Sequence, residues 1–161
     1  MKSLQEIGID YFKFKKDLRI ETRDGKQWIY DPIRKKFLVM QAEEVVRQLL
    51  LNYLIQKKGY SPIHIKVEKG IKLNNTRKRY DILVYNKSII PILLVECKAP
   101  GIPLNQTVVD QIARYNIVAK VPYLFLTNGQ NNYCLKIDFE QKDYECLSEI
   151  PDYSTLIKES L

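Results

Sequence analysis

The sequence is poor in the residues that build metal clusters and cross-links. It has one histidine, His64, and three cysteines, Cys97, Cys134 and Cys146. No CxxC pair and no Cys/His cluster occurs, so neither a zinc site nor a disulfide framework is indicated. The cysteines are expected to be small, reduced, apolar side chains, as in the cytosol. His64 has no Asp or Ser near it in the sequence, so a structural role is expected for it.

Long hydrophobic runs are also missing. The longest apolar run, residues 89–95, is far shorter than the roughly 20 residues that span a bilayer. Residues 1–6 lack the apolar core of a secretory signal. No internal repeat or linker-like stretch divides the chain. The sequence therefore predicts a cytoplasmic protein with no membrane partner, folded as a single domain over residues 1–161.

Positive charge is in excess. The chain has 26 Lys and Arg against 19 Asp and Glu, a formal net charge of +7. Lys and Arg near phosphates displace condensed counterions, so this balance favours a polyanionic partner. Two clusters are candidates for contacts to a nucleic-acid backbone: Arg77, Lys78 and Arg79, and Arg34, Lys35 and Lys36. A solvated charged loop is the alternative for each.

Apolar periodicity predicts a mixed α/β protein. Helical spacing is clearest over residues 41–58 and recurs over residues 105–120. Buried or alternating runs predict strands at residues 63–67, 80–85, 90–98, 122–127 and 133–139, with two shorter strands between 28 and 39. This order gives a mixed sheet with helices on its faces. Residues 28–140 form the expected core, 1–27 an irregular N-terminal segment, and 141–161 a C-terminal extension with a weak helix.

Two acids and a lysine stand at the ends of two strands that form a predicted hairpin. If the chain reverses within residues 86–91, residues whose numbers sum to about 177 lie opposite each other, so Asp81 faces Glu96. Lys98 lies two residues beyond Glu96 and shares its face. Two carboxylates this close need a proton or a cation between them, and Mg²⁺ is the usual choice for phosphate chemistry. A register slip would separate the pair, and a Glu-x-Lys triplet alone is often only a surface salt bridge.

These segments resemble the PD-(D/E)xK nuclease core. The matching strings are Arg79-Tyr80-Asp81-Ile82-Leu83-Val84, Leu94-Val95-Glu96-Cys97-Lys98-Ala99-Pro100 and Gln111-Ile112-Ala113-Arg114-Tyr115. More narrowly, residues 28–140 are similar to the nuclease domain at the N-terminus of type I restriction enzyme R proteins. Residues 31–36, 43–48 and 123–129 take part in this similarity. The resemblance implies an α/β, restriction-endonuclease-like three-layer fold with a mixed central β-sheet flanked by helices.

The resemblance also implies an activity. It describes a Mg²⁺-dependent endonuclease that hydrolyses phosphodiester bonds of DNA, with Mn²⁺ as a substitute metal. Asp81, Glu96 and the main-chain carbonyl of Cys97 match the metal ligands, and Lys98 matches the catalytic lysine. Tyr80 stands where many members have the proline of "PD".

Two further parts of the resemblance lie on the predicted helices. Gln111 and Tyr115 match a QxxxY motif beside the active site, and their i, i+4 spacing puts them on one helical face. A metal-binding acid of the first helix matches Glu44 by its neighbours, whereas helix phase favours Glu43. Both acids also suit the first turn of a helix simply as partners of its dipole.

The implied partners are DNA and other restriction-modification or helicase subunits, and the sequence leaves the oligomeric state open. No helicase motor accompanies the nuclease motifs within the 161 residues. One alternative is a catalytically idle nucleic-acid-binding module of the same fold in a larger restriction or repair complex. Another is an unrelated basic α/β domain that binds proteins.

Overall fold

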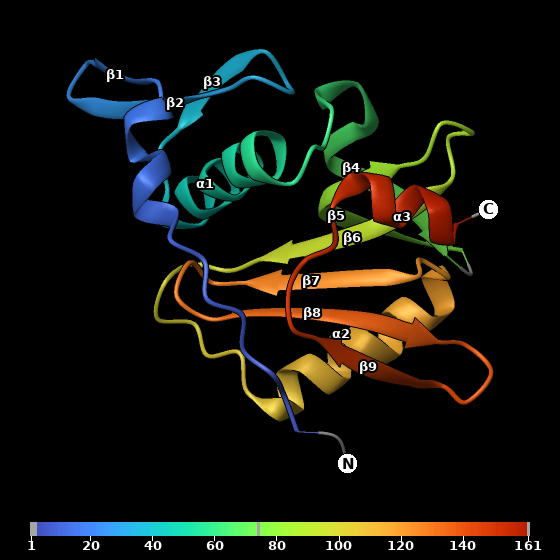
Figure 1. The fold of residues 1–161 in the computed structure, drawn as a ribbon. Helices are drawn as coiled ribbons and strands as arrows, with labels where there is room; N and C mark the ends of the chain where they lie inside the picture. Colours follow the sequence, from blue (N-terminus) through green and yellow to red (C-terminus); the bar gives the residue numbers. More distant parts are fainter. Residues whose placement is uncertain (1–2, 74, 161) are drawn as a thin grey trace.

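The computed structural model describes residues 3–73 and 75–160 and contains two β-sheets (Figure 1). The larger sheet has six strands in the order β4-β5-β6-β7-β8-β9, and the smaller has three in the order β1-β2-β3. The larger sheet comprises β4 (Ile65–Leu73), β5 (Thr76–Tyr85), β6 (Pro91–Cys97), β7 (Tyr123–Thr127), β8 (Asn132–Asp138) and β9 (Asp143–Leu147). The smaller comprises β1 (Ile20–Arg23), β2 (Lys26–Asp31) and β3 (Lys36–Val39).

Three α-helices pack against the larger sheet: α1 (Ala42–Lys57), α2 (Gln106–Ala119) and α3 (Tyr153–Glu159). Helix α1 begins and ends within a residue of the predicted 41–58, and α2 within a residue of 105–120. The Asn105 side chain caps α2 by accepting a hydrogen bond from Val108 N at 3.0 Å. Within the described ranges, none of the helices has the length and apolar character needed to cross a membrane.

The central strands β6 and β7 are buried on both faces. They pair in parallel, because α2 carries the chain from one to the other, whereas the other neighbours in this sheet are antiparallel. In β7, Phe125 packs in the core cluster under α1, and Leu124 packs in the cluster under α2. This explains the uninterrupted apolar runs in the sequence, which are typical of a sheet covered on both sides. The predicted mixed sheet flanked by helices is confirmed.

The N-terminal segment is more ordered than predicted. Instead of an irregular stretch, residues 11–31 contain the 3-10 helix η1 (Tyr11–Asp17) and strands β1 and β2. The buried rings of Tyr11 and Phe14 contact Tyr53 of α1 edge-on, at centroid distances of 6.4 and 6.0 Å. Asp24 and Gly25 form the β1–β2 turn with φ of 49° and 76°. An Asp-Gly pair favours such hairpins because both positions need positive φ.

The N-terminal segment also contacts the end of β7 and the start of β8. Ile7 N donates to Asn132 O at 2.8 Å, and the Tyr11 hydroxyl donates to Asn132 Oδ1 at 2.8 Å. Thr127 at the end of β7 also donates to Asn132 Oδ1, at 2.7 Å. Burial raises the pKa of Tyr11, so its hydroxyl keeps its proton. This buried cluster ties the N-terminal segment to the ends of β7 and β8.

The strand boundaries differ from prediction in two other places. The strand expected at residues 63–67 starts as the short 3-10 helix η2 (Pro62–His64), and β4 then extends to Leu73. Its partner β5 begins at Thr76 rather than at residue 80. The C-terminal extension adds strand β9 as well as the expected helix. The predicted strands were too short because charged and small residues interrupt the apolar pattern in the added parts. These parts are held mainly by backbone pairing.

The three cysteines are free, as expected. Cys97 and Cys134 are buried, and burial raises the pKa of both thiols. We therefore expect a thiol reagent at pH 8 to label Cys146 first in the native protein and the other two only after unfolding. Mass spectrometry of timed samples measures this order. Native labelling of Cys97 at the rate of Cys146 would contradict the packing.

Candidate active site

The hairpin of β5 and β6 has the predicted register. Leu83 pairs with Leu94, and Ile82 pairs with Val95. Asp81 and Glu96 are the next residues of the two strands beyond the last of these pairs. The only shift in the ladder lies between Val84 and Tyr85, near the turn and away from the acids. The register prediction is confirmed as far as Ile82 and Val95. Beyond that pair the Asp81 carboxylate contacts Arg47 of α1, whereas the side chain of Glu96 lies on the α2 side, so the two acids do not share a face as predicted.

Asp81 is held from two sides. Its Oδ2 accepts a hydrogen bond from the backbone N–H of Cys97 at 2.8 Å, and its Oδ1 accepts one from Arg47 Nη2 at 2.8 Å. The first contact comes from β6 and the second from α1. Both donors are fixed by the fold, so the carboxylate has a defined orientation at the meeting point of two strands and a helix.

Glu96 and Lys98 continue β6 beyond its apolar part. Val95 and Cys97 pack in the cluster under α1, so alternation turns Glu96 towards the opposite side, where α2 lies. Glu96 is buried, and Lys98 is half-buried directly after the strand. The Lys98 N–H donates to Thr127 O at 2.8 Å, which fixes the backbone of this lysine to the end of β7.

The two QxxxY residues behave differently. Tyr115 is half-buried and packs against the cluster under α2, whereas Gln111 is exposed on the same helix. Tyr80, at the position of the missing proline, is buried near Tyr115. Burial first, and then the nearby Tyr115 and Glu96, raise the pKa of Tyr80 to about 12. Tyr115 and Glu96 therefore share Tyr80 as a neighbour, and the structure gives Gln111 no such contact.

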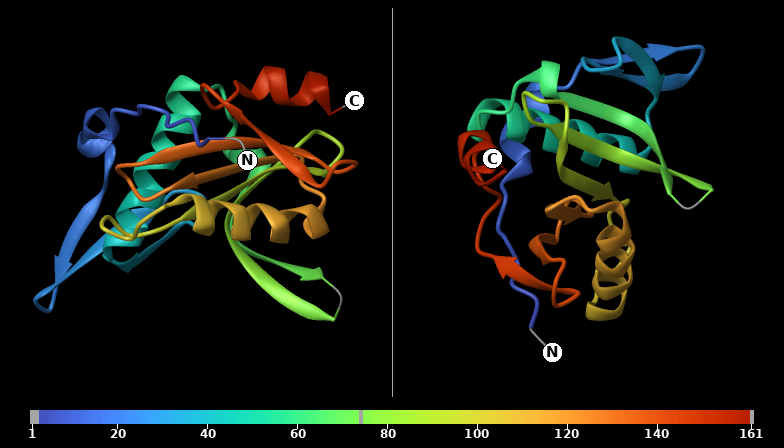
Figure 2. Two further views of the ribbon diagram at one scale, coloured as in Figure 1. Left: turned by 90° about the horizontal axis from the view of Figure 1, so that it is seen from below. Right: turned by 90° about the vertical axis from the view of Figure 1, so that its right-hand side faces the viewer.

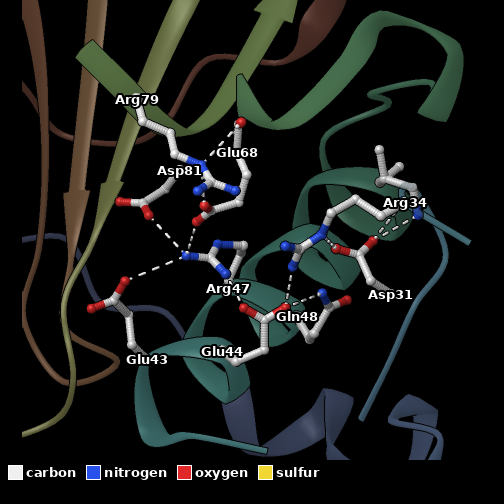
Figure 3. A network of polar contacts seen from close by, with 10 residues as sticks. Asp31, Arg34, Glu43, Glu44, Arg47, Gln48, Glu68, Arg79 and Asp81 are labelled. Carbon is white, nitrogen blue, oxygen red and sulfur yellow. Dashed lines mark hydrogen bonds and ion pairs between the residues drawn. The ribbon is translucent and has the colours of Figure 1, made fainter. Parts of the chain in front are cut away.

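Arg47 lies at the centre of a group of acids (Figure 3). Its side chain is 4% exposed, and its Nη2 atom lies 2.8 Å from Asp81, 2.8 Å from Glu68 and 3.4 Å from Glu43. Its Nη1 atom forms an ion pair with Glu44. One guanidinium thus offsets the charge of several carboxylates that would otherwise repel one another.

The ion pairs extend from Arg47 in both directions. Arg34 contacts Glu44 and also donates through Nε to Asp31 Oδ2 at 2.5 Å, which reaches the end of β2. On the other side, Arg79 Nε lies 2.5 Å from Glu68 Oε2. A continuous chain of ion pairs therefore connects the small sheet, α1, β4 and β5, as Figure 3 shows.

The two acids of the first helical turn have distinct surroundings. Glu44 is buried between Arg34, Arg47 and Gln48, whose amide donates to it at 3.3 Å. Glu43 is 44% exposed and approaches the same Arg47 nitrogen that contacts Asp81. Burial, followed by the Asp81 charge, raises the pKa of Glu43. Glu43 is therefore the acid that shares a partner atom with Asp81.

A hollow of about 320 Å³ opens beside this network. It is lined by Arg34, Leu38, Val39, Gln41, Glu43, Glu44, Arg47 and Glu68. Its lining joins the edge of the small sheet to the start of α1 and to β4. Within the described ranges, no three His, Cys, Asp or Glu side chains are grouped closely enough to hold a metal ion.

One predicted basic cluster lies on β5, and the other lies at the turn that leads into β3. Arg77 and Arg79 are exposed on β5, and Arg79 is paired with Glu68, while the side chain of Lys78 lies outside the described part. Lys35 is exposed in the turn between β2 and β3, and Lys36 is exposed as the first residue of β3.

His64 serves packing, as its sequence context predicts. Its ring stacks on the Tyr153 ring of α3, with a centroid distance of 5.2 Å and an interplanar angle of 16°. His64 therefore joins η2 to α3 and takes no part in the acidic network.

The chain matches a protein-family model and resembles a solved structure. The family model described as type I restriction enzyme R protein N terminus matches residues 42–151. A fragment of a putative HsdR subunit of a type I restriction enzyme from Vibrio vulnificus has a similar structure, with a TM-score of 0.53 and 19% identity. The match covers 74% of this chain and 25% of that one, so the chain spans about a quarter of that protein. At this identity the likeness shows a shared fold. No curated protein matches the sequence.

Proposed function

Because this chain belongs to the family of type I restriction enzyme R protein N termini, we propose that it is a Mg²⁺-dependent DNA endonuclease domain. The observation that carries the proposal is the hairpin of β5 and β6. Its register pairs Ile82 with Val95, so Asp81 and Glu96 are the next residues of the two strands, and Lys98 follows two residues later. Neither the family nor the hairpin identifies a catalytic residue, so the residue roles given below belong to the proposal.

The donors at this point suit a hard cation. Asp81, Glu96 and the main-chain carbonyl of Cys97 offer only oxygen ligands, which Mg²⁺ and Mn²⁺ prefer. Asp81 Oδ1 now contacts Arg47, so binding an ion requires this oxygen to exchange a guanidinium partner for the ion. Glu43, exposed beside Asp81, is a better placed additional ligand than the more deeply buried Glu44.

Each side chain has a separate task in the proposed reaction. A bound Mg²⁺ would supply charge that offsets the negative phosphate as it is attacked. Lys98, two residues after Glu96, would orient the attacking water and stabilise charge on the phosphate oxygens through its ammonium group. Asp81 and Glu96 would hold the ion at the hairpin end, which requires the Glu96 side chain to turn towards Asp81. Tyr115 is proposed to position the strand from α2, with Gln111 exposed on the same helix.

A plasmid-nicking assay tests the proposal. Supercoiled DNA is expected to be nicked when Mg²⁺ or Mn²⁺ is added and to stay intact in EDTA or when Asp81 is replaced by Asn. Oligonucleotide substrates, single-stranded and duplex, then show which form is cut. DNA binding without cleavage under every metal condition would instead indicate an idle binding module.

The natural setting of such a domain is a larger assembly. The similar fragment is described as part of an HsdR subunit, and this chain spans about a quarter of it. We propose that DNA reaches the site through other restriction-modification or helicase subunits. Nicking that rises when such subunits are added would support this partnership, and nicking unchanged by them would contradict it.

A further inference from the structure

The outer face of the small sheet combines aromatic rings with exposed cations. Register places Glu21 opposite Trp28, and Tyr30 opposite Phe37. These residues share the face that points away from α1, whereas Ile29 on the other face is fully buried. In Figure 1 and in the right-hand view of Figure 2, no described helix or strand lies over this outer side.

Two arginines lie over these rings. The Arg19 guanidinium is 5.0 Å from the Tyr30 ring centre and 5.1 Å from that of Phe37. The Arg23 guanidinium is 4.5 Å from the Phe37 ring centre and 5.9 Å from that of Trp28. Both side chains remain open to solvent, at 64% and 50% exposure. The rings thus hold both guanidiniums in place at the surface.

Such held guanidiniums suit phosphate groups. An Arg fork matches two phosphate oxygens, and a side chain that is already ordered loses less conformational entropy when it binds. Glu21 is the one acid on this face, and it contacts Arg23 at 2.8 Å and Arg19 at 3.8 Å. Its carboxylate occupies the N–H groups that a phosphate would take, so it competes with a bound anion.

The face also leads to the candidate active site. Val39 lies opposite Trp28 in the small sheet and also lines the hollow beside Arg47. Arg19 and Arg23 therefore lie on a face that borders this hollow, and we expect a nucleic-acid strand to approach Asp81 along it. A nucleic-acid backbone supplies phosphates at regular intervals, which fits two fixed cations better than a single small anion does.

We propose that the outer face of the small sheet binds backbone phosphates of the nucleic acid that enters the active site, through Arg19 and Arg23 held on Tyr30, Phe37 and Trp28. This rests on the proposed function, which supplies the nucleic-acid substrate. Because the contacts are to phosphates, they are independent of base sequence.

The test is binding of a short fluorescent duplex, and of one of its strands alone, in EDTA. The double variant Arg19→Ala/Arg23→Ala is expected to bind about tenfold more weakly. The slope of log K against log salt should fall by about 1.8 for duplex, since each lost phosphate contact removes about 0.9. Arg19→Lys/Arg23→Lys should keep the slope but lose affinity, because lysine lacks the fork. Glu21→Gln should bind more tightly than the wild type.

A matched control removes two positive charges elsewhere. Lys87 and Lys158 are exposed and flank a hollow beside α3, so Lys87→Ala/Lys158→Ala should bind almost as the wild type does. The proposal is overturned if the arginine double variant binds within twofold of the wild type, or if the lysine control weakens binding equally. Plasmid nicking by the wild type is scored separately. If the wild type nicks plasmid and the arginine variant binds DNA as tightly as the wild type, only this inference is refuted. If the arginine variant loses binding and the wild type does not nick plasmid, only the proposed nuclease function is refuted.

Discussion

Replacing Lys98 with alanine is expected to lower the rate of Mg²⁺-dependent DNA cleavage by at least about 10²–10³-fold, the usual effect of removing one charge-stabilising donor. The backbone of Lys98 is fixed by Thr127, and only its ammonium group is lost in the variant. The fold and the binding of DNA should therefore remain close to those of the wild type. Nicking rates and duplex affinity, measured side by side, separate the two effects.

The control for this variant is Lys87→Ala, which removes an equal charge from the exposed turn between β5 and β6. It should cleave DNA at the wild-type rate. Cleavage by Lys98→Ala at the same rate as Lys87→Ala would remove Lys98 from the mechanism. A loss of binding that matches the loss of cleavage would show that the lysine serves the substrate's backbone instead.

Replacing Arg47 with alanine is expected to destabilise the protein by about 3–5 kcal/mol, because it leaves buried carboxylates without their shared cation. The partners Asp81 and Glu68 have side chains only 13% and 20% exposed, so water screens them poorly. Urea denaturation followed by circular dichroism measures the change. Cleavage should also fall, since Asp81 loses the donor that orients Oδ1.

Arg79 provides the comparison for Arg47. It also pairs with Glu68, at 2.5 Å, but its side chain is 69% exposed. Because exposed ion pairs contribute little, Arg79→Ala should cost no more than about 1 kcal/mol. If the Arg47 and Arg79 variants were equally stable, the ion pairs around Arg47 would not be a main source of stability.

The strand pairing of the hairpin could be predicted from the sequence because it depends on local rules. Strand alternation and a short turn set which residues face each other, and the abrupt change from apolar residues to Glu96 marks the strand's end. The core helices and strands followed from apolar periodicity in the same way. The assignment of metal and catalytic roles to these residues stays a prediction.

Arg47 escaped prediction because its partners are distant in the sequence. Asp81 lies 34 residues away, and nothing in the pattern of α1 indicates that contact. Helix phase also gave no sign that Glu44 is buried, since it compares only the apolar residues of α1. The small sheet and Arg34 cover that side of the helix and bury Glu44. The Asp24-Gly25 pair was the available signal for this sheet.

The bond from Ile7 to Asn132 has a consequence for the order of events during translation. Its two ends lie 125 residues apart, so the N-terminal segment leaves the ribosome long before β8 exists to receive it. Thr127, which holds the backbone of Lys98, is made just before Asn132. A nascent chain can therefore fix the backbone of Lys98 only after Thr127 has been made, and dock its N-terminal segment only after Asn132 has followed.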